Sequence, residues 1–88
     1  MYYVYILQSL KDNRTYVGFC RNIAKRIKEH NKGKVKATKN RRFLKIIYLE
    51  KAGNIEAAKK REKYWKSGGG RRKLKQFFEK GFPPAQLC

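Results

Sequence analysis

Arg26 and His30 carry side chains suited to pairing with an anion and to exchanging protons. They lie four residues apart in a helix expected to begin at Ile23, and residues at that spacing share one face of a helix. With Ile23 at zero and about 100° per residue, His30 falls at about 340° and Arg26 at about 300°, so both interrupt the apolar stripe. From the residues alone, a half-buried histidine bonded to a backbone carbonyl is the simpler interpretation of His30.

Glu62 is the second residue whose position suggests chemistry. In the helix predicted over residues 55–66, the apolar stripe consists of Ile55, Ala58 and Trp65, at about 0°, 300° and 280°. Glu62 falls at about 340°, inside that stripe. Such a carboxylate must accept hydrogen bonds, pair with a cation or bind a metal ion, because an unpaired buried charge is very costly. The pattern alone favours a salt bridge to one of the many basic side chains.

The charge of the chain limits its partners. There are 24 Lys and Arg residues against 6 Asp and Glu, a formal net charge of +18. Such a field attracts polyanions, so nucleic acid is the expected partner. A membrane surface is a weaker candidate, because the basic residues do not gather opposite one wide apolar helix face. No apolar run approaches the roughly 20 residues of a membrane span.

The length of the chain and its cysteines further limit the class of protein. With 88 residues, one domain is expected. Cys20 and Cys88 show neither metal-ligand spacing nor a disulfide framework, and no signal peptide is expected before Tyr2. We therefore expect a cytoplasmic protein, and with one His and two scattered Cys a zinc finger is not expected.

The elements that must position these residues begin with a strand at residues 2–10, apolar on both faces as is typical of a central strand. A polar turn of hairpin length leads to an antiparallel second strand at residues 15–19. Asn22 can cap the helix that follows, and Gly33 can end it.

The second half of the chain predicts a strand and two helices. The strand covers residues 43–50, with Leu44, Ile46 and Tyr48 on one face. Asn54 can cap the helix over residues 55–66, and Glu50 and Glu56 beside it are expected to be surface charges. Three glycines, Gly68 to Gly70, are expected to break the chain before a last helix from Arg71 to Lys80.

The expected fold is α+β, a small three-stranded antiparallel sheet flanked by helices in the order β-β-α-β-α-α. One domain would cover residues 1–81, and residues 82–88 would form a C-terminal tail.

The segment from Gly33 to Arg42 is strongly basic and contains almost nothing that could form a core. It is either a solvated loop or an arm that contacts phosphates, and the charge of the whole chain favours the arm. The residues expected to bind nucleic acid there are Lys34, Lys36, Lys39, Arg41 and Arg42.

Two short motifs resemble the signature of the GIY-YIG nuclease family. They are Tyr3-Val4-Tyr5 and Tyr16-Val17-Gly18, in which Tyr5 and Tyr16 would be the signature tyrosines. The resemblance continues through Arg26 and His30 to Glu62, covers nearly the whole chain, and is greatest to the small members that consist of this domain alone. Tyr3 replaces the first glycine, and the asparagine that many members carry after the glutamate helix has no clear counterpart.

The resemblance implies a metal-dependent endonuclease that hydrolyses DNA phosphodiester bonds in repair, recombination or processing. Glu62 would be the one protein ligand to Mg²⁺ or Mn²⁺, and Arg26 would stabilise the charge on the phosphate. Tyr5 and Tyr16 would hold the attacking water with help from His30, and Tyr5 is preferred as the general base. A tyrosine base would need its pKa brought from about 10 to near 7, a change of roughly 4 kcal/mol.

Two other classes stay open at this point. The same fold could serve as a non-catalytic nucleic-acid-binding module, or the chain could be a basic protein of the ribosome or of a membrane surface. The inward carboxylate favours the nuclease, since binding alone needs Lys and Arg only. The expected partner is the DNA backbone, with no membrane, and the expected state is a monomer or weak dimer.

Overall fold

The computed structural model describes residues 1–36, 38–39 and 42–83. Three strands and three helices follow in the predicted order, β-β-α-β-α-α, which confirms the α+β fold. They are β1 (Tyr2–Ser9), β2 (Thr15–Cys20), α1 (Ile23–Asn31), β3 (Leu44–Ala52), α2 (Ile55–Lys66) and α3 (Gly68–Lys80). Among the described residues, no helix is both long and apolar enough to cross a bilayer.

The strands form one antiparallel sheet in the order β2-β1-β3, so the strand that is apolar on both faces lies at the centre as predicted. A β-bulge interrupts the pairing of β1 with β3: Ile6 pairs with Tyr48 but Leu7 pairs with Ile46. Ile47 is therefore the extra residue, and the alternation of β3 inverts there. The prediction that Leu44 and Tyr48 share a face is wrong for this reason.

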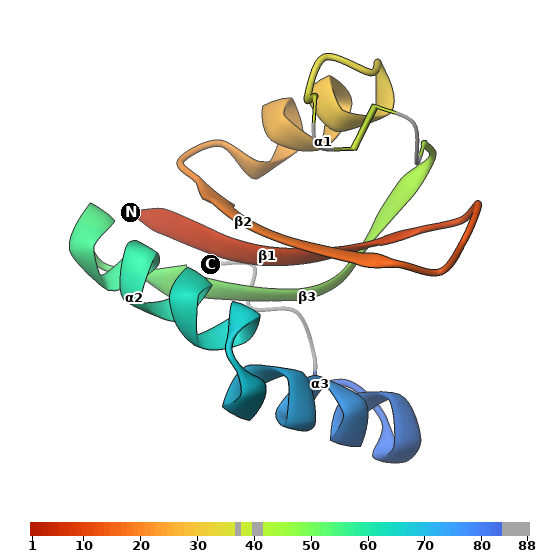
Figure 1. The fold of residues 1–88 in the computed structure, drawn as a ribbon. Coiled ribbons are helices and arrows are strands. Elements are labelled where there is room, and N and C mark those ends of the chain that lie inside the picture. Colours follow the sequence, from red (N-terminus) through yellow and green to blue (C-terminus); the bar gives the residue numbers. More distant parts are fainter. Residues whose placement is uncertain (37, 40–41, 84–88) are drawn as a thin grey trace.

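Different helices cover the two faces of the sheet (Figure 1), and each face carries a separate core. Helix α1 covers one face, where Tyr5, Leu7, Leu44 and Leu49 are buried. Helices α2 and α3 cover the other, larger core, which contains Val4, Ile6, Val17, Ala52, Ala58, Trp65 and Leu74. A residue of β1 thus contacts either α1 or the pair of C-terminal helices, according to its parity in the strand.

The three glycines do not break the chain, and the prediction that α3 begins at Arg71 is wrong. They form the first turn of α3, where the Ser67 side chain accepts a hydrogen bond from the Gly70 N–H. A Cβ atom at Gly70 would clash with the backbone of Tyr64 and Trp65. Glycine is needed because the start of α3 lies directly against the end of α2.

The end of the described chain still packs on the fold. Phe82 lies 5.5 Å from Phe77 and 5.0 Å from Phe78, measured between ring centroids. The last five residues of the predicted tail, 84–88, lie outside the described residues. The boundary at residue 81 stays a prediction.

Candidate active site

A buried hydrogen-bonded network joins the centre of the sheet to α1. The hydroxyl of Tyr5, on β1, lies 3.1 Å from His30 Nε2, and Arg26 Nε donates to the same hydroxyl at 3.3 Å. Tyr5 and His30 are fully buried. The spacing of Arg26 and His30 thus brings both to one tyrosine, and His30 is bonded to side chains and not to a backbone carbonyl.

Thr38 is a member of this network that sequence reasoning missed. Its Oγ1 lies 2.7 Å from His30 Nδ1, and it is fully buried although it belongs to the basic segment between α1 and β3. Tyr5 Oη accepts from Arg26, so its own proton is free to point to His30 Nε2. If Tyr5 donates to Nε2, the neutral imidazole carries its proton on Nδ1 and donates to Thr38 Oγ1. A threonine among lysines gives no signal in the sequence.

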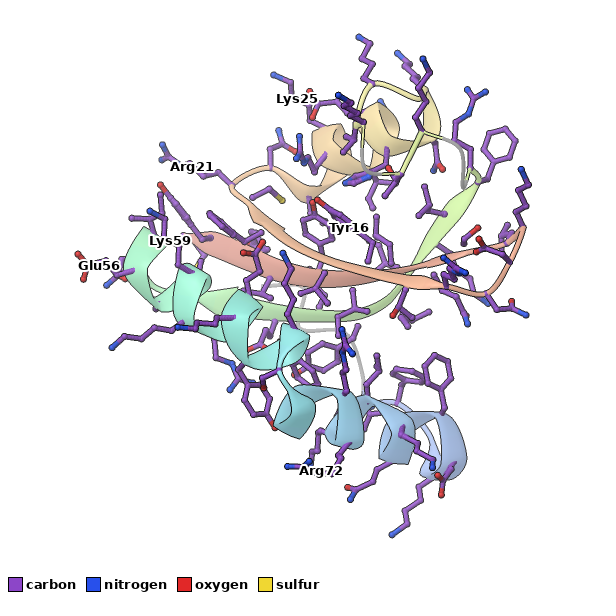
Figure 2. All side chains as sticks on the ribbon, viewed as in Figure 1. Tyr16, Arg21, Lys25, Glu56, Lys59 and Arg72 are labelled. Carbon is purple, nitrogen blue, oxygen red and sulfur yellow. The ribbon has the colours of Figure 1, made fainter. Side chains whose placement is uncertain are left out.

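Tyr16 lies beside this network, on the side of β2 that faces α1 (Figure 2). Its ring centroid is 5.2 Å from that of His30 and 6.5 Å from that of Tyr5. Tyr16 is half-buried, whereas Tyr5 has no exposed surface. A Cβ atom at Gly18 would lie 2.5 Å from Tyr5 Oη, so the glycine of the second motif makes room for the first tyrosine.

Burial governs the protonation states of the network. Loss of water raises the pKa of Tyr5 to about 12, although the hydrogen bond and charge of Arg26 act in the opposite direction. Burial, and then the charge of Arg26, lowers the pKa of His30 below its ordinary value. In the resting protein Tyr5 is therefore a neutral phenol and His30 a neutral imidazole. The lowered pKa that a general base requires is not found at Tyr5.

Arg26 is the accessible end of the network. Its side chain is 35% exposed, and one terminal nitrogen lies 3.3 Å from Glu29 Oε1. Ion pairs of this kind at a surface contribute about 0–1 kcal/mol, so Glu29 is a partner that an incoming anion can replace.

Glu62 lies apart from these residues, on α2 at the other face of the sheet. Its side chain is 25% exposed, and one carboxylate oxygen lies 3.7 Å from Lys66 Nζ. Lys66 and Tyr16 line the same small hollow at the edge of β2, and Glu62 is not part of its lining. The structure brings Tyr5, Tyr16, Arg26 and His30 together and places Glu62 on the helix that covers the opposite face of the sheet.

The buried carboxylate of this region is Glu50, and the prediction that it is a surface charge is wrong. Glu50 is 8% exposed and accepts hydrogen bonds from Arg61 at 2.8 and 3.1 Å and from Trp65 Nε1 at 2.5 Å. The bulge at Ile47 turns Glu50 toward α2 and not toward α1. The pair of Glu50 with Arg61 leaves the Glu62 carboxylate to its looser contact with Lys66.

The donors available to a divalent ion are few. Among the described residues, no group of three or more His, Cys, Asp and Glu side chains converges. Mg²⁺ and Mn²⁺ keep several waters and accept one or two carboxylates, so the loosely paired Glu62 is chemically suitable as a single protein ligand.

The basic segment after α1 presents its charges to solvent, as the prediction of a nucleic-acid-binding arm requires. Lys34, Lys36, Lys39 and Arg42 are exposed, and Arg41 lies outside the described residues. Basic side chains elsewhere, such as Lys25, Lys59 and Arg72, also extend away from the ribbon (Figure 2). Positive charge thus surrounds the fold, and the arm is the part of it that Thr38 ties to His30.

The fold and the clustered tyrosines, arginine and histidine define the class of protein. Residues 1–75 match the family model of the GIY-YIG catalytic domain, so the chain belongs to the GIY-YIG family of nucleases. Members of that family bind DNA and typically use divalent metal ions.

Within this family the chain is similar to the small stand-alone UPF0213 proteins of bacteria. It is 45% identical over 62 residues to one from Syntrophus aciditrophicus, covering 68% of this chain and 70% of that protein. It is 39% identical over 80 residues to UPF0213 protein SH2523 of Staphylococcus haemolyticus, covering 90% and 96%. The solution NMR structure of UPF0213 protein BH0048 from Bacillus halodurans matches with a TM-score of 0.55 and 33% identity, covering 94% and 89%.

Proposed function

We propose that this protein is a metal-dependent endonuclease that hydrolyses DNA phosphodiester bonds in DNA repair, recombination or processing. One observation carries the proposal: the Tyr5 hydroxyl is bonded to both Arg26 and His30, beside Tyr16, in a chain of the GIY-YIG family. A module that only binds nucleic acid has no need of a buried network that ends in an accessible guanidinium.

Each residue of the network has a distinct role in the proposed reaction. Arg26 binds a non-bridging oxygen of the scissile phosphate and stabilises the charge that develops there. Tyr16, which is half-buried, contacts the attacking water. Tyr5 stays protonated and fixes the position of Arg26, since its raised pKa is unsuited to a base. His30, held neutral, is hydrogen-bonded through Nε2 to the Tyr5 hydroxyl and helps to hold that phenol in place beside Arg26.

Glu62 is the proposed ligand for Mg²⁺ or Mn²⁺. The ion would neutralise charge on the leaving oxygen and on the phosphate. Lys66 Nζ lies 3.7 Å from the Glu62 carboxylate, where the metal ion would bind. The lysine side chain would move aside when the ion binds. The proposed partner is the DNA backbone, contacted by the arm lysines, in a cytoplasmic monomer or weak dimer that cuts one strand at a time.

The position of Glu62 favours a second candidate, a non-catalytic nucleic-acid-binding module. Its contact is with Lys66, on the face of the sheet opposite His30. Nicking of supercoiled plasmid by purified protein separates the two functions. The nuclease nicks the plasmid with Mg²⁺ or Mn²⁺ and stops when EDTA is added.

Tyr16→Phe should lower the nicking rate by about 10²-fold or more, because it removes the hydroxyl that contacts the water. Tyr3→Phe is the matched control, since Tyr3 packs against the same core without joining the network. A folded protein that binds plasmid but leaves it uncut with both ions would support the binding module.

A further inference from the structure

Two adjoining hollows form one groove along the free edge of β2. The larger, of about 370 Å³, is lined by Lys75, Phe78 and Glu79, and the smaller, of about 190 Å³, by Tyr16, Val17, Trp65 and Lys66. Thr15, Arg71 and Leu74 line both, so the two are continuous. This β2–α3 groove therefore passes Tyr16 at the edge of β2 and runs along α3 to Phe78.

The side chains of the β2–α3 groove combine an aromatic surface with positive charge. Phe78 is 48% exposed and packs at right angles against Phe82, which holds the ring in place. Leu74 forms the apolar floor beside it, and Arg71 and Lys75 lie one turn apart on the exposed side of α3. Glu79 contributes one negative charge. An exposed ring with two cations in a row beside it on the same helix matches a nucleobase and the phosphates that lead away from it on one side.

The shape of the groove decides which nucleic acid fits it. Bases of a duplex are paired and stacked, so reaching a hollow beside the strand edge requires an unpaired or extruded base. An acidic peptide would satisfy Arg71 and Lys75 but would leave the aromatic surface of Phe78 without a partner. The occupant that uses Phe78, Arg71 and Lys75 together is an unpaired nucleotide.

We propose that the β2–α3 groove binds an unpaired nucleobase of the strand whose neighbouring phosphate reaches Tyr16. This inference rests on the proposed function, since it takes the strand in the groove to be the strand that is cut. It assigns Phe78, Arg71 and Lys75 to substrate binding and predicts a preference for DNA with an unpaired nucleotide beside the scissile bond.

The test measures binding without cleavage. A labelled single-stranded oligonucleotide is titrated with protein in EDTA and followed by fluorescence anisotropy at fixed salt. Phe78→Ala should weaken binding by about 5-fold or more, the usual effect of losing one base–aromatic stack. Phe78→Leu keeps an apolar side chain but removes the ring, so it should weaken binding as well. Circular dichroism spectra of both variants identify any loss of affinity that is caused by unfolding.

Matched ligands and variants separate base binding in the β2–α3 groove from general attraction of charge. Phe78→Ala should bind an abasic oligonucleotide of equal length, a blunt duplex and polyglutamate as tightly as the parent protein does. Lys75→Ala should flatten the salt dependence by about 0.7 units, while Lys73→Ala on the same helix should leave it unchanged, since Lys73 lies over the Phe77 ring and not in the groove.

Two results would overturn the proposal. One is unchanged binding of the single strand by both Phe78 variants. The other is an equal loss of affinity for polyglutamate, which would indicate a peptide or charge-only surface. The proposed nuclease activity is tested separately. A parent protein that never nicks plasmid can still bind the single strand more tightly in EDTA than the Phe78 variants do.

Discussion

The face of the sheet under α1 and the face under α2 and α3 each bury a polar network that ends in a half-exposed arginine. Under α1, Arg26 bonds to the neutral phenol of Tyr5, and its side chain is 35% exposed. Under α2, Arg61 bonds with two nitrogens to the carboxylate of Glu50, and its side chain is 43% exposed. The two arginines resemble each other in burial and differ in the charge of their partners.

This difference separates a structural pair from a site. The charge of Arg61 is neutralised by Glu50, which also accepts from the buried Trp65, so this network fastens α2 to β3. Among the described residues, the charge of Arg26 is offset by the looser contact with Glu29 alone. A weakly compensated guanidinium held by a buried neutral network is suited to an incoming phosphate. The variants below test this comparison.

The largest effect is expected for the two glutamates of the second face. Glu62→Gln keeps the shape but removes the proposed metal ligand, so nicking should fall to background while the melting temperature stays equal or rises. Glu50→Gln removes one partner of a buried pair and should lower the stability by roughly 2 kcal/mol, below the usual 3–5 because Arg61 can reach water. Thermal unfolding and plasmid nicking measure both. A lowered melting temperature with nicking retained in Glu62→Gln would place Glu62 in a structural role.

The same substitution at the two arginines should give opposite results. Arg26→Lys keeps the charge but loses the planar fork, so turnover should fall by at least ~10²-fold with DNA affinity and stability nearly intact. Arg61→Lys should lower stability by about 1 kcal/mol, or roughly 4–8 °C in melting temperature, with the activity of the folded protein retained. If Arg26→Lys nicked plasmid as fast as the parent, Arg26 would be a general phosphate contact.

A smaller effect is expected from the arm beside α1. Replacing Lys34, Lys36 and Lys39 together by Ala should flatten the log–log dependence of DNA affinity on salt by up to ~3 units. Lys59, Lys60 and Lys73, exposed on the helices of the other face, form the matched control triple and should change it less. Equal changes in the two triples would mean that the whole surface attracts DNA without a preferred side.

The smallest effect is a dependence of stability on pH through His30. Because its pKa is lowered in the folded protein, the unfolded chain takes up the proton first as the pH falls through about 6.5. The contribution of His30 to the free energy of unfolding is therefore complete above about pH 6.5 and is lost below it. The free energy of unfolding should change there by at most about 1.4 kcal/mol per pH unit. Urea unfolding between about pH 7.5 and 5 should show this slope in the parent and lack it in His30→Gln. The groups that face His30 are Tyr5, Tyr16, Arg26, Glu29 and Thr38.

Local patterns were sufficient for the order of the helices and strands and for placing Arg26 and His30 together in the candidate site. The apolar run of β1 predicted its central place, and Asn22 and Asn54 cap α1 and α2 as expected. The spacing of Arg26 and His30 predicted a shared helix face, and both contact Tyr5. These features depend on the side-chain periods of strands and helices, two and 3.6 residues, which are determined by residues close together in the chain.

Only the tertiary structure decided which polar groups are buried and with which partners. The bulge at Ile47 turns Glu50 toward Trp65 and Arg61, and no strand pattern indicates where such a bulge falls. Thr38 is buried because His30, eight residues away, offers it a ring nitrogen. The glycines begin a helix because α2 packs against Gly70. In each case the burial of a residue depends on a partner in another element of the fold, and that partner is fixed only when the elements have packed together.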